Sequence, residues 1–539
     1  KEPRAALPYL AQVVDGQPSQ AEPYLHYADA HLQIGANPKF AAQALEKALT
    51  LDPDNELAQV LMGEAQSADG NHTAAMQSFQ NALDSPLRED QRWSPRIILG
   101  FGKTALELGH IETGLATLKE GYQQNPDNLS LAQGLVEAYL KADLHPRALD
   151  ILRDAFQIAP DDISNLSWIA RQAREAGSPE DAVRALNKIT RIAPQHVPAY
   201  LDLAKAHLQQ GSPEKASSTL AKVIDLEEAQ PDDLFQTGDQ LLRLGDLQQG
   251  MKSLKKAANI CQSNPALEDD LPKIWSRLGD GYEMNGDPEH ALELLDKAIA
   301  AELGQPEWRV KKAELLVRMR RYQAALASLE NALELSPHHP AYHYKLAVVH
   351  RRVSDYQTAL HHAQKAVKGY RHDGQQGMGS VDYLQAVNLA AHTAAGNLQP
   401  ELAQELLETL KIETFQDAKK PEYSAALALQ AELALDQNQE VEAAELINHL
   451  VEDQEHHPRV RALQARLLVR QGSFREAQQS LDKALTTHRK GKFQEDILTT
   501  ATPLAIGKAA REIQAWQESL EHSRTAAASP PQEPQPHYY

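Results

Sequence analysis

The chain has a single cysteine, Cys261, among its 539 residues. This excludes a disulfide within the chain and a zinc site built from several cysteines. Aromatic residues make up only 5% of the sequence, and the apolar total of 42% is rich in alanine and leucine, which suits helices better than a β-sandwich. No stretch approaches the roughly 18 consecutive apolar residues that a membrane-spanning helix needs.

Positive charge is also in deficit, because the formal net charge is −20. Such a charge argues against non-specific binding to nucleic acid or to an anionic membrane. No signal-peptide pattern opens the chain, but Lys1 is not a start methionine, which leaves open that an upstream segment has been removed. A cytoplasmic location is slightly favoured, and a periplasmic one would require such a removed signal peptide.

The segment 272–298 contains two helical patterns separated by a break. The first places four residues at i, i+3, i+4 and i+7 on one helix face: Trp275, Leu278, Gly279 and Tyr282. Asn285-Gly286-Asp287-Pro288 interrupts the pattern, with the proline where a second helix would begin. The second helix carries Ala291, Leu295 and Ala298 on one face. W-x2-L-G-x2-Y followed by A-x3-L-x2-A resembles the tetratricopeptide repeat.

The same pattern returns along the whole chain. Repeats 1 to 14 begin at residues 22, 56, 95, 129, 163, 197, 231, 272, 306, 340, 384, 424, 458 and 500, and eight of the thirteen intervals equal 34. Position 20, counted from each start, is Ala, Gly or Ser in all fourteen repeats, which lets two helix backbones approach closely where they cross. The sequence therefore predicts an all-α solenoid, an α-α superhelix of about fourteen helix–turn–helix repeats.

Departures from the period divide the chain into five expected segments. They are a partial repeat with only its second helix (1–21), an N-terminal array of ten repeats (22–368), a Gly-rich loop or hinge (369–383), a C-terminal array of four repeats (384–528) and a Pro-rich tail or linker (529–539). A longer surface loop on a continuous solenoid is the alternative to a hinge. The partial first repeat leads us to expect truncation or processing at the N-terminus.

Catalytic and metal patterns are weak. Gly279-Asp280-Gly281 lies inside a predicted helix without the strand that a dinucleotide fold requires. Histidines cluster near His343 and at His361-His362, but those at 338–339 and 456–457 occupy turns between repeats, where polar residues are ordinary. Asp161-Asp162 precedes a first helix, where carboxylates cap N–H groups. We expect no catalytic, cofactor or metal site.

A binding surface follows from helix geometry and from the family resemblance. Positions 2, 5, 9, 12 and 13 of each first helix point away from the packed face, and in tetratricopeptide repeat proteins that face lines a concave groove. Between residues 458 and 492 the sequence has nine Lys or Arg residues and only two acidic residues. The candidate groove residues are Arg459, Arg466, Arg470, Lys508, Arg511, Tyr344, Arg351, Arg352, Asn388 and His392. Arginines suit carboxylate or phosphate groups, and the alternative is a solvated face whose arginines pair with neighbouring acids.

Two known subtypes of the family do not match. Members that clamp a peptide C-terminus have Lys or Arg at position 5 and Asn at position 9, whereas here those positions read Asn388 and His392 in repeat 11. Members that act in sugar transfer carry asparagine at position 6, whereas here it is Trp168 in repeat 5 and Lys345 in repeat 10. Neither function is expected.

The leading hypothesis is a non-enzymatic scaffold or adaptor that binds a segment of a protein partner, favouring an acidic one, in its concave groove. One alternative is the sensor or regulatory arm of a larger effector or enzyme, and another is a periplasmic repeat subunit of a polysaccharide export system. RNA binding is opposed by the net charge of −20.

Overall fold

The computed structural model describes residues 3–35, 37–84, 95–372, 381–413, 421–454, 456–489 and 502–528. Within these ranges the regular structure is helical throughout, with 28 α-helices, one 3₁₀ helix and no strand, which confirms the predicted fold class. The chain forms two compact units, residues 1–268 (unit 1) and 269–539 (unit 2). None of the described helices is both long and apolar enough to cross a membrane.

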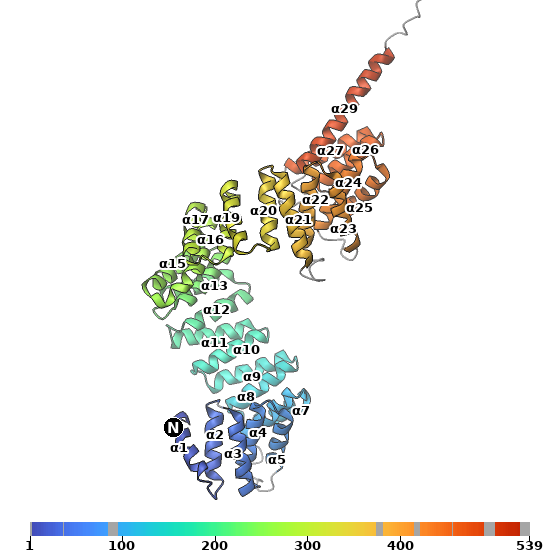
Figure 1. The fold of residues 1–539 in the computed structure, drawn as a ribbon. Helices are drawn as coiled ribbons and strands as arrows, with labels where there is room; N and C mark the ends of the chain where they lie inside the picture. The colour runs from blue at the N-terminus through green and yellow to red at the C-terminus, as the bar shows by residue number, and fades with distance from the viewer. Residues whose placement is uncertain are drawn as a thin grey trace, which may run out of the picture. The chain divides into compact units, whose positions relative to one another are not determined.

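Unit 1 contains one leading helix followed by seven antiparallel helix pairs, in which each helix packs on the next along the chain (Figure 1). Its helices are α1 (Pro3–Asp15), α2 (Glu22–Gln33), α3 (Pro38–Leu51), α4 (Glu56–Ala68), α5 (His72–Leu83), α6 (Pro95–Glu107), α7 (Ile111–Gln124), α8 (Leu129–Lys141), α9 (His145–Ile158), α10 (Ile163–Glu175), α11 (Pro179–Ile192), α12 (Val197–Gln209), α13 (Pro213–Asp225), α14 (Pro231–Arg243) and α15 (Leu247–Ser263).

A short 3₁₀ helix, η1 (Pro265–Asp270), precedes the six helix pairs of unit 2 and its last helix. These helices are α16 (Leu271–Met284), α17 (Pro288–Ala301), α18 (Pro306–Arg318), α19 (Tyr322–Leu335), α20 (Pro340–Arg352), α21 (Tyr356–His372), α22 (Val381–Gly396), α23 (Pro400–Glu413), α24 (Pro421–Asp436), α25 (Glu440–Gln454), α26 (Pro458–Arg470), α27 (Phe474–Arg489) and α29 (Thr502–Ala528).

The turn inside each repeat has a left-handed residue at position 15. In repeats 2 to 13 the backbone φ there is positive, and seven of these twelve residues are glycine. Gly286, for example, has φ of 82°, a conformation that costs glycine little because it lacks a Cβ. Where the turn ends, Asp287 accepts a hydrogen bond from the N–H of His290 and caps α17. The break that the sequence predicts at 285–288 is confirmed.

Small residues let the two helices of a repeat approach closely, as the sequence pattern at position 20 predicts. In repeat 7, a Cβ added to Gly238 would lie 2.6 Å from Cγ of Leu254 and 3.0 Å from the carbonyl oxygen of Gly250. Position 24 fills the space between the paired helices with a buried apolar side chain, such as Leu220 in unit 1 and Leu295 in unit 2. The core of each unit therefore lies between successive helices, in several separate clusters of buried side chains.

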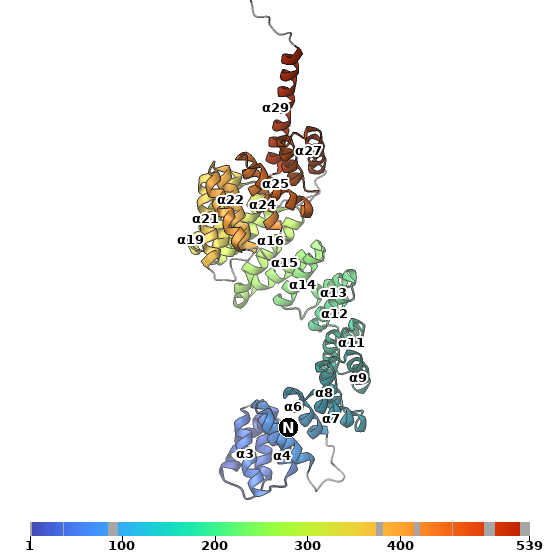
Figure 2. The same cartoon turned by 90° about the vertical axis from the view of Figure 1, so that its right-hand side faces the viewer.

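Repeat 14 is not a helix–turn–helix. α29 runs without a break from Thr502 to Ala528 and continues past α26 and α27 (Figures 1 and 2). Position 15 of this repeat is Gln514, in the middle of α29, where neither glycine nor proline favours a turn. The prediction of a separate second helix in repeat 14 is therefore wrong.

The predicted Gly-rich loop 369–383 is shorter than expected, because 369–372 belong to α21 and 381–383 to α22, while 373–380 lie outside the described residues. The whole tail 529–539 also lies outside them. The hinge and the linker stay predictions. By contrast, Asp162 accepts hydrogen bonds from the N–H groups of Ser164 (2.8 Å) and Asn165 (3.3 Å), so this carboxylate is a helix cap as predicted.

Candidate functional site

All ten predicted groove residues lie on first helices of repeats in unit 2, and successive first helices contact one another. Tyr344, Arg351 and Arg352 are on α20, Asn388 and His392 on α22, Arg459, Arg466 and Arg470 on α26, and Lys508 and Arg511 on α29. The helix between the second and third of these, α24, carries acidic residues at positions 9 and 13 that the sequence reasoning did not select.

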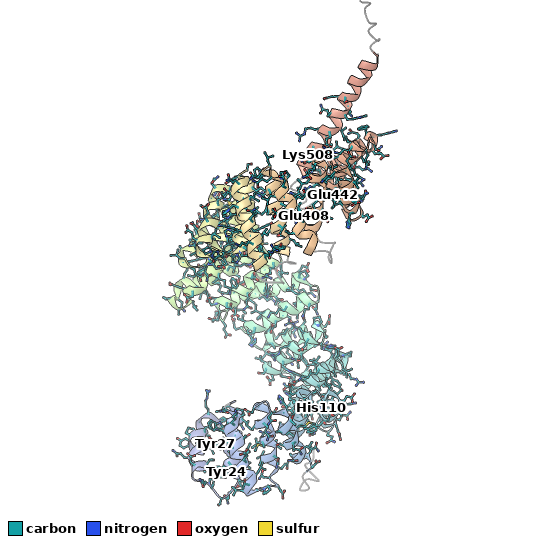
Figure 3. All side chains as sticks on the ribbon, turned by 45° about the vertical axis from the view of Figure 1, so that its right-hand side comes forward. Tyr24, Tyr27, His110, Glu408, Glu442 and Lys508 are labelled. Atoms are coloured by element: carbon teal, nitrogen blue, oxygen red, sulfur yellow. The ribbon has the colours of Figure 1, made fainter. Side chains whose placement is uncertain are left out.

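The two acids of α24, Glu432 and Asp436, bind bases from two later repeats. Nη2 of Arg459 donates to Oε2 of Glu432 at 3.2 Å. Nζ of Lys508 donates to Oε1 of Glu432 at 2.9 Å and to Oδ2 of Asp436 at 2.8 Å, so α29 reaches back past α26 to α24 (Lys508 is labelled in Figure 3).

Arg466 completes this network from α26. Its Nη2 donates to Oδ1 of Asp436 at 2.6 Å and to Oε1 of Glu512 at 2.8 Å, while its Nε donates to the same Glu512 oxygen at 3.0 Å. Two side chains at the centre are almost fully covered, with exposed fractions of 0% for Arg459 and 2% for Arg466. We call these six residues the acid–base network: Glu432, Asp436, Arg459, Arg466, Lys508 and Glu512.

The charges of the network stabilise one another against the cost of burial. Burial raises the pKa of Glu432, but the charges of Arg459 and Lys508 outweigh it and the pKa stays below its ordinary value. Burial likewise lowers the pKa of Lys508, and its two acids raise it above the ordinary value. Glu432 and Lys508 are therefore charged at neutral pH.

This arrangement corrects the prediction of an open arginine stripe. Arg459 and Arg466 are buried and held by acids of the same chain, because α29 packs against α26 and Lys508 reaches α24. The alternative of pairing with neighbouring acids describes them better, except that the pairs are buried rather than solvated. The periodicity of α26 shows which way its arginines point, but not that another helix covers them.

Asn388 is also buried rather than presented to a groove. Its exposed fraction is 0%, and its Nδ2 donates to the carbonyl oxygen of Leu384 at 3.0 Å, one turn earlier in α22. At the other end of unit 2, half-buried Arg470 donates to Oδ1 of Asn438, and Arg511 is exposed. A binding role for Arg470 and Arg511 stays a prediction.

The end of α20 carries two arginines that have no acidic partner among the described residues. Arg352 is exposed and Arg351 is half-buried, close to Tyr344 and Tyr356. On the neighbouring helix α22, Nε2 of His392 is buried and has no hydrogen-bond partner within the described part of the chain. Burial lowers the pKa of His392 well below its ordinary value, and the charges of Arg459 and Arg351 lower it further.

A cluster of histidines packs between α20 and α21. Nε2 of His343 lies 3.1 Å from the carbonyl oxygen of Pro337, and its Nδ1 lies 2.9 Å from Nδ1 of His362. His343 therefore donates from Nε2 and accepts at Nδ1, which requires a proton on Nδ1 of His362. Burial lowers the pKa of His362 to about 4, with the neighbouring imidazoles of His343 and His350 adding to the effect. Across the described residues, no group of three or more His, Cys, Asp or Glu side chains has a metal-binding arrangement.

Unit 1 has a surface hollow of about 680 Å³ between α13 and α15, lined in part by three lysines. Two of them already bind the end of α13. Nζ of Lys252 lies 3.2 Å from Oδ1 of Asp225, and Nζ of Lys256 donates to the carbonyl oxygens of Ile224 (2.6 Å) and Leu226 (3.2 Å). These lysines act as a helix C-cap, which is a structural role.

Comparison with family models matches four segments of the chain to two models that are both described as "Tetratricopeptide repeat". One matches residues 105–167 and 173–233, and the other residues 2–56 and 310–374. No curated protein sequence matches the chain significantly.

Several solved structures match the chain at low sequence identity. A structure titled "MamA 41-end from Desulfovibrio magneticus RS-1" is 22% identical over 33% of this chain and 97% of that chain, with a TM-score of 0.28. A tetratricopeptide repeat protein from Parabacteroides merdae is 17% identical over 47% of this chain and 98% of its own, with a TM-score of 0.31. The structure "Naa15/Naa10 bound to HypK-THB" is 12% identical over 98% and 95%, with a TM-score of 0.33.

Proposed function

Because the chain belongs to the tetratricopeptide repeat family, we propose that it is a non-enzymatic scaffold that binds a segment of a protein partner along the first helices of unit 2. Repeats of this kind generally serve as interaction scaffolds rather than as catalysts. The finer statement, that the bound segment is acidic and lies against α20 and α22, is our inference from the charges of those helices.

The proposal rests on a difference among the first helices of unit 2, in how many of their basic side chains form ion pairs with acids of the chain. On α24, α26 and α29 the three bases of the acid–base network are matched by three acids of the chain itself, while Arg470 binds the amide of Asn438 and Arg511 is exposed. On α20, Arg351 and Arg352 have no such match among the described residues. In a chain of net charge −20, this is a local excess of positive charge that an acidic segment would neutralise.

The test is capture of the partner from native cells by the full chain. The variant Arg351→Glu with Arg352→Glu reverses the charge of α20 and should reduce partner recovery at least tenfold. The matched control, Arg371→Glu with Arg475→Glu, makes the same charge change at two exposed positions on the second helices α21 and α27, and should leave recovery unchanged. Equal recovery with both variants would contradict the proposal.

A further inference from the structure

Arg351 is a half-buried charge with no acidic partner among the described residues. Burial lowers the pKa of its guanidinium, the hydroxyls of Tyr356 and Tyr344 oppose that shift, and the charges of Arg352 and Arg459 add to it. No hydrogen bond or ion pair holds this guanidinium in the described part of the chain. Keeping a half-buried cation without an anion is unfavourable, so its presence requires an explanation.

His392, on the neighbouring helix, also has a polar atom without a hydrogen-bond partner among the described residues. It lies on α22, which packs against α20, and its Nε2 is shielded from solvent with no partner within the residues described. Buried polar atoms in native proteins are nearly always hydrogen-bonded, to the protein, to water or to a ligand. A neutral imidazole can carry its proton on Nε2 and donate it to an incoming acceptor.

The acid–base network cannot supply that acceptor. Its three bases pair with its three acids, and Glu432 is already bound by Arg459 and Lys508. Arg351 therefore adds one positive charge to a set that is otherwise balanced. No acid among the described residues supplies a negative charge for Arg351.

We infer that Arg351 and His392 form an anion subsite that takes a single carboxylate of the bound segment, from an aspartate or glutamate side chain. The guanidinium offers two parallel N–H donors that match both carboxylate oxygens, and Nε2–H of His392 offers a third. This inference rests on the proposed function and names the anchoring contact within it.

Charge favours a carboxylate over a phosphate group. One carboxylate neutralises the one unmatched charge of Arg351. A phosphate dianion would need a second cation that is buried like Arg351. The neighbouring Arg352 is exposed to water, and burial opposes protonation of His392. The site thus combines one permanent cation with one neutral donor, which is the set that suits a monoanion.

The test uses the full chain and two probes, a fluorescein-labelled hexaglutamate peptide and inorganic phosphate. We expect Arg351→Gln to weaken peptide binding at least tenfold and His392→Ala about threefold or more, measured by fluorescence anisotropy at fixed salt. Arg475→Gln, an exposed arginine on α27, is the matched control and should keep the wild-type affinity. Equal affinity of wild type and Arg351→Gln would overturn the inference. Phosphate binding through Arg351 that is tighter than peptide binding would overturn its choice of carboxylate.

A stability measurement separates a binding role from a structural one. If Arg351 is kept for a ligand, Arg351→Gln without ligand should melt at the wild-type temperature or above it, because an unmatched charge is removed. A clear drop in melting temperature would assign Arg351 a structural role and overturn the inference.

The outcomes also separate this subsite from the proposed function. Suppose that the variant Arg351→Glu with Arg352→Glu loses the cellular partner, but Arg351→Gln binds hexaglutamate as well as wild type does. The proposed function would then be supported and the anion subsite contradicted. Suppose instead that Arg351→Gln weakens hexaglutamate binding, but the double variant recovers the cellular partner normally. The anion subsite would then be supported and the proposed function contradicted.

Discussion

One ion pair occurs at equivalent positions in both units, in two very different environments. In unit 1, Arg96 at position 2 of repeat 3 binds Glu64 at position 9 of repeat 2, with Nε 2.6 Å from Oε1. In unit 2, Arg459 at position 2 of repeat 13 binds Glu432 at position 9 of repeat 12. The exposed fractions of the side chains are 44% and 28% in unit 1, but 0% and 6% in unit 2.

The two ion pairs differ in exposure because different side chains and helices surround them. Arg96 also reaches Asp29 of repeat 1 at 3.1 Å, so in unit 1 one base links three successive first helices while it remains open to water. In unit 2 the corresponding pair is covered, because α29 packs on α26 and adds Lys508 and Glu512. The same positional pattern therefore produces a solvated link in one unit and a buried network in the other.

Burial changes what the pair contributes to stability. Exposed ion pairs are worth about 0–1 kcal/mol, because water screens them and the long side chains lose freedom. Breaking a buried pair costs about 3–5 kcal/mol, since it leaves a charge without compensation. The comparison therefore predicts unequal effects from the same substitution at the two equivalent acids.

The largest expected effect is that of Glu432→Gln. It leaves Arg459 and Lys508 short of one buried negative charge and should destabilise the end of unit 2 by about 3–5 kcal/mol. Glu64→Gln, the equivalent change in unit 1, should cost about 1 kcal/mol or less. Urea unfolding gives the size of each loss, and hydrogen exchange should place the first on α24, α26 and α29. Similar losses in the two variants would show that burial does not distinguish the pairs.

The apolar core should not distinguish the units. Leu220→Ala in unit 1 and Leu295→Ala in unit 2 truncate the same position 24, and both leucines are buried, with exposed fractions of 0% and 3%. Each should cost about 2–5 kcal/mol through lost burial and the cavity left behind. Urea unfolding of the two variants checks this. A loss well below that range in one unit only would mean that its helices close around the cavity.

Most of the fold could be predicted from the sequence, because its determinants repeat every 34 residues or so. The turn at 285–288 and the small residue Gly238 each act within one repeat, so a local pattern is enough to find them. The continuous helix α29 was missed although its cause was readable, since position 15 of repeat 14 is Gln514 and not a turn-forming residue.

The candidate site could be predicted less well, because it depends on contacts between repeats. Helix periodicity placed Arg459 and Arg466 on the correct face, but their burial comes from α29, two first helices further along from α24. Glu432 could have been found by applying position 9, already used for Arg466, to repeat 12. The isolation of Arg351 has no sequence pattern, since it consists of the absence of an acid on neighbouring helices among the described residues.

Mild acid should weaken unit 2 through His362. Its pKa is about 4 in the folded protein against about 6.5 when unfolded, so the folded state binds fewer protons between these values. Stability from this group is complete above pH 6.5 and falls as the pH drops toward 4, by an amount on the order of 2 kcal/mol after allowance for partial solvent screening.

The measurement is urea unfolding of unit 2 at pH 7.0 and 5.0, in wild type and in His362→Gln, which cannot take up the proton. The variant should lose clearly less stability over this interval than wild type. The pKa values of Glu432 and Asp436 are lowered, so these acids respond only at still lower pH. The pKa values of His343 and His392 are lowered too, so the difference between wild type and variant, and not the total loss, measures His362. The same pH dependence in wild type and variant would assign the acid sensitivity to other groups.

The smallest expected effect concerns the turns, where the two units also differ. Position 15 has positive φ throughout repeats 2 to 13, but it is glycine in five of six repeats in unit 1 and in only two of six in unit 2. Leu398 in repeat 11 has φ of 58° and is 89% exposed, so its side chain contributes little burial to set against the strained backbone. Leu398→Gly should stabilise unit 2 by about 1 kcal/mol.

The reverse change at an equivalent turn tests the same cause with the opposite sign. Gly177→Leu in repeat 5 puts a Cβ on a residue with φ of 78°, where no atom lies within 4 Å of it, so any loss comes from the backbone and not from a clash. It should cost about 1–2 kcal/mol. If Leu398→Gly destabilises while Gly177→Leu also destabilises, Leu398 must make a contact that its exposure does not reveal. If both changes have the expected signs, the turns of unit 2 are intrinsically weaker than those of unit 1, and its stability depends more heavily on the buried acid–base network.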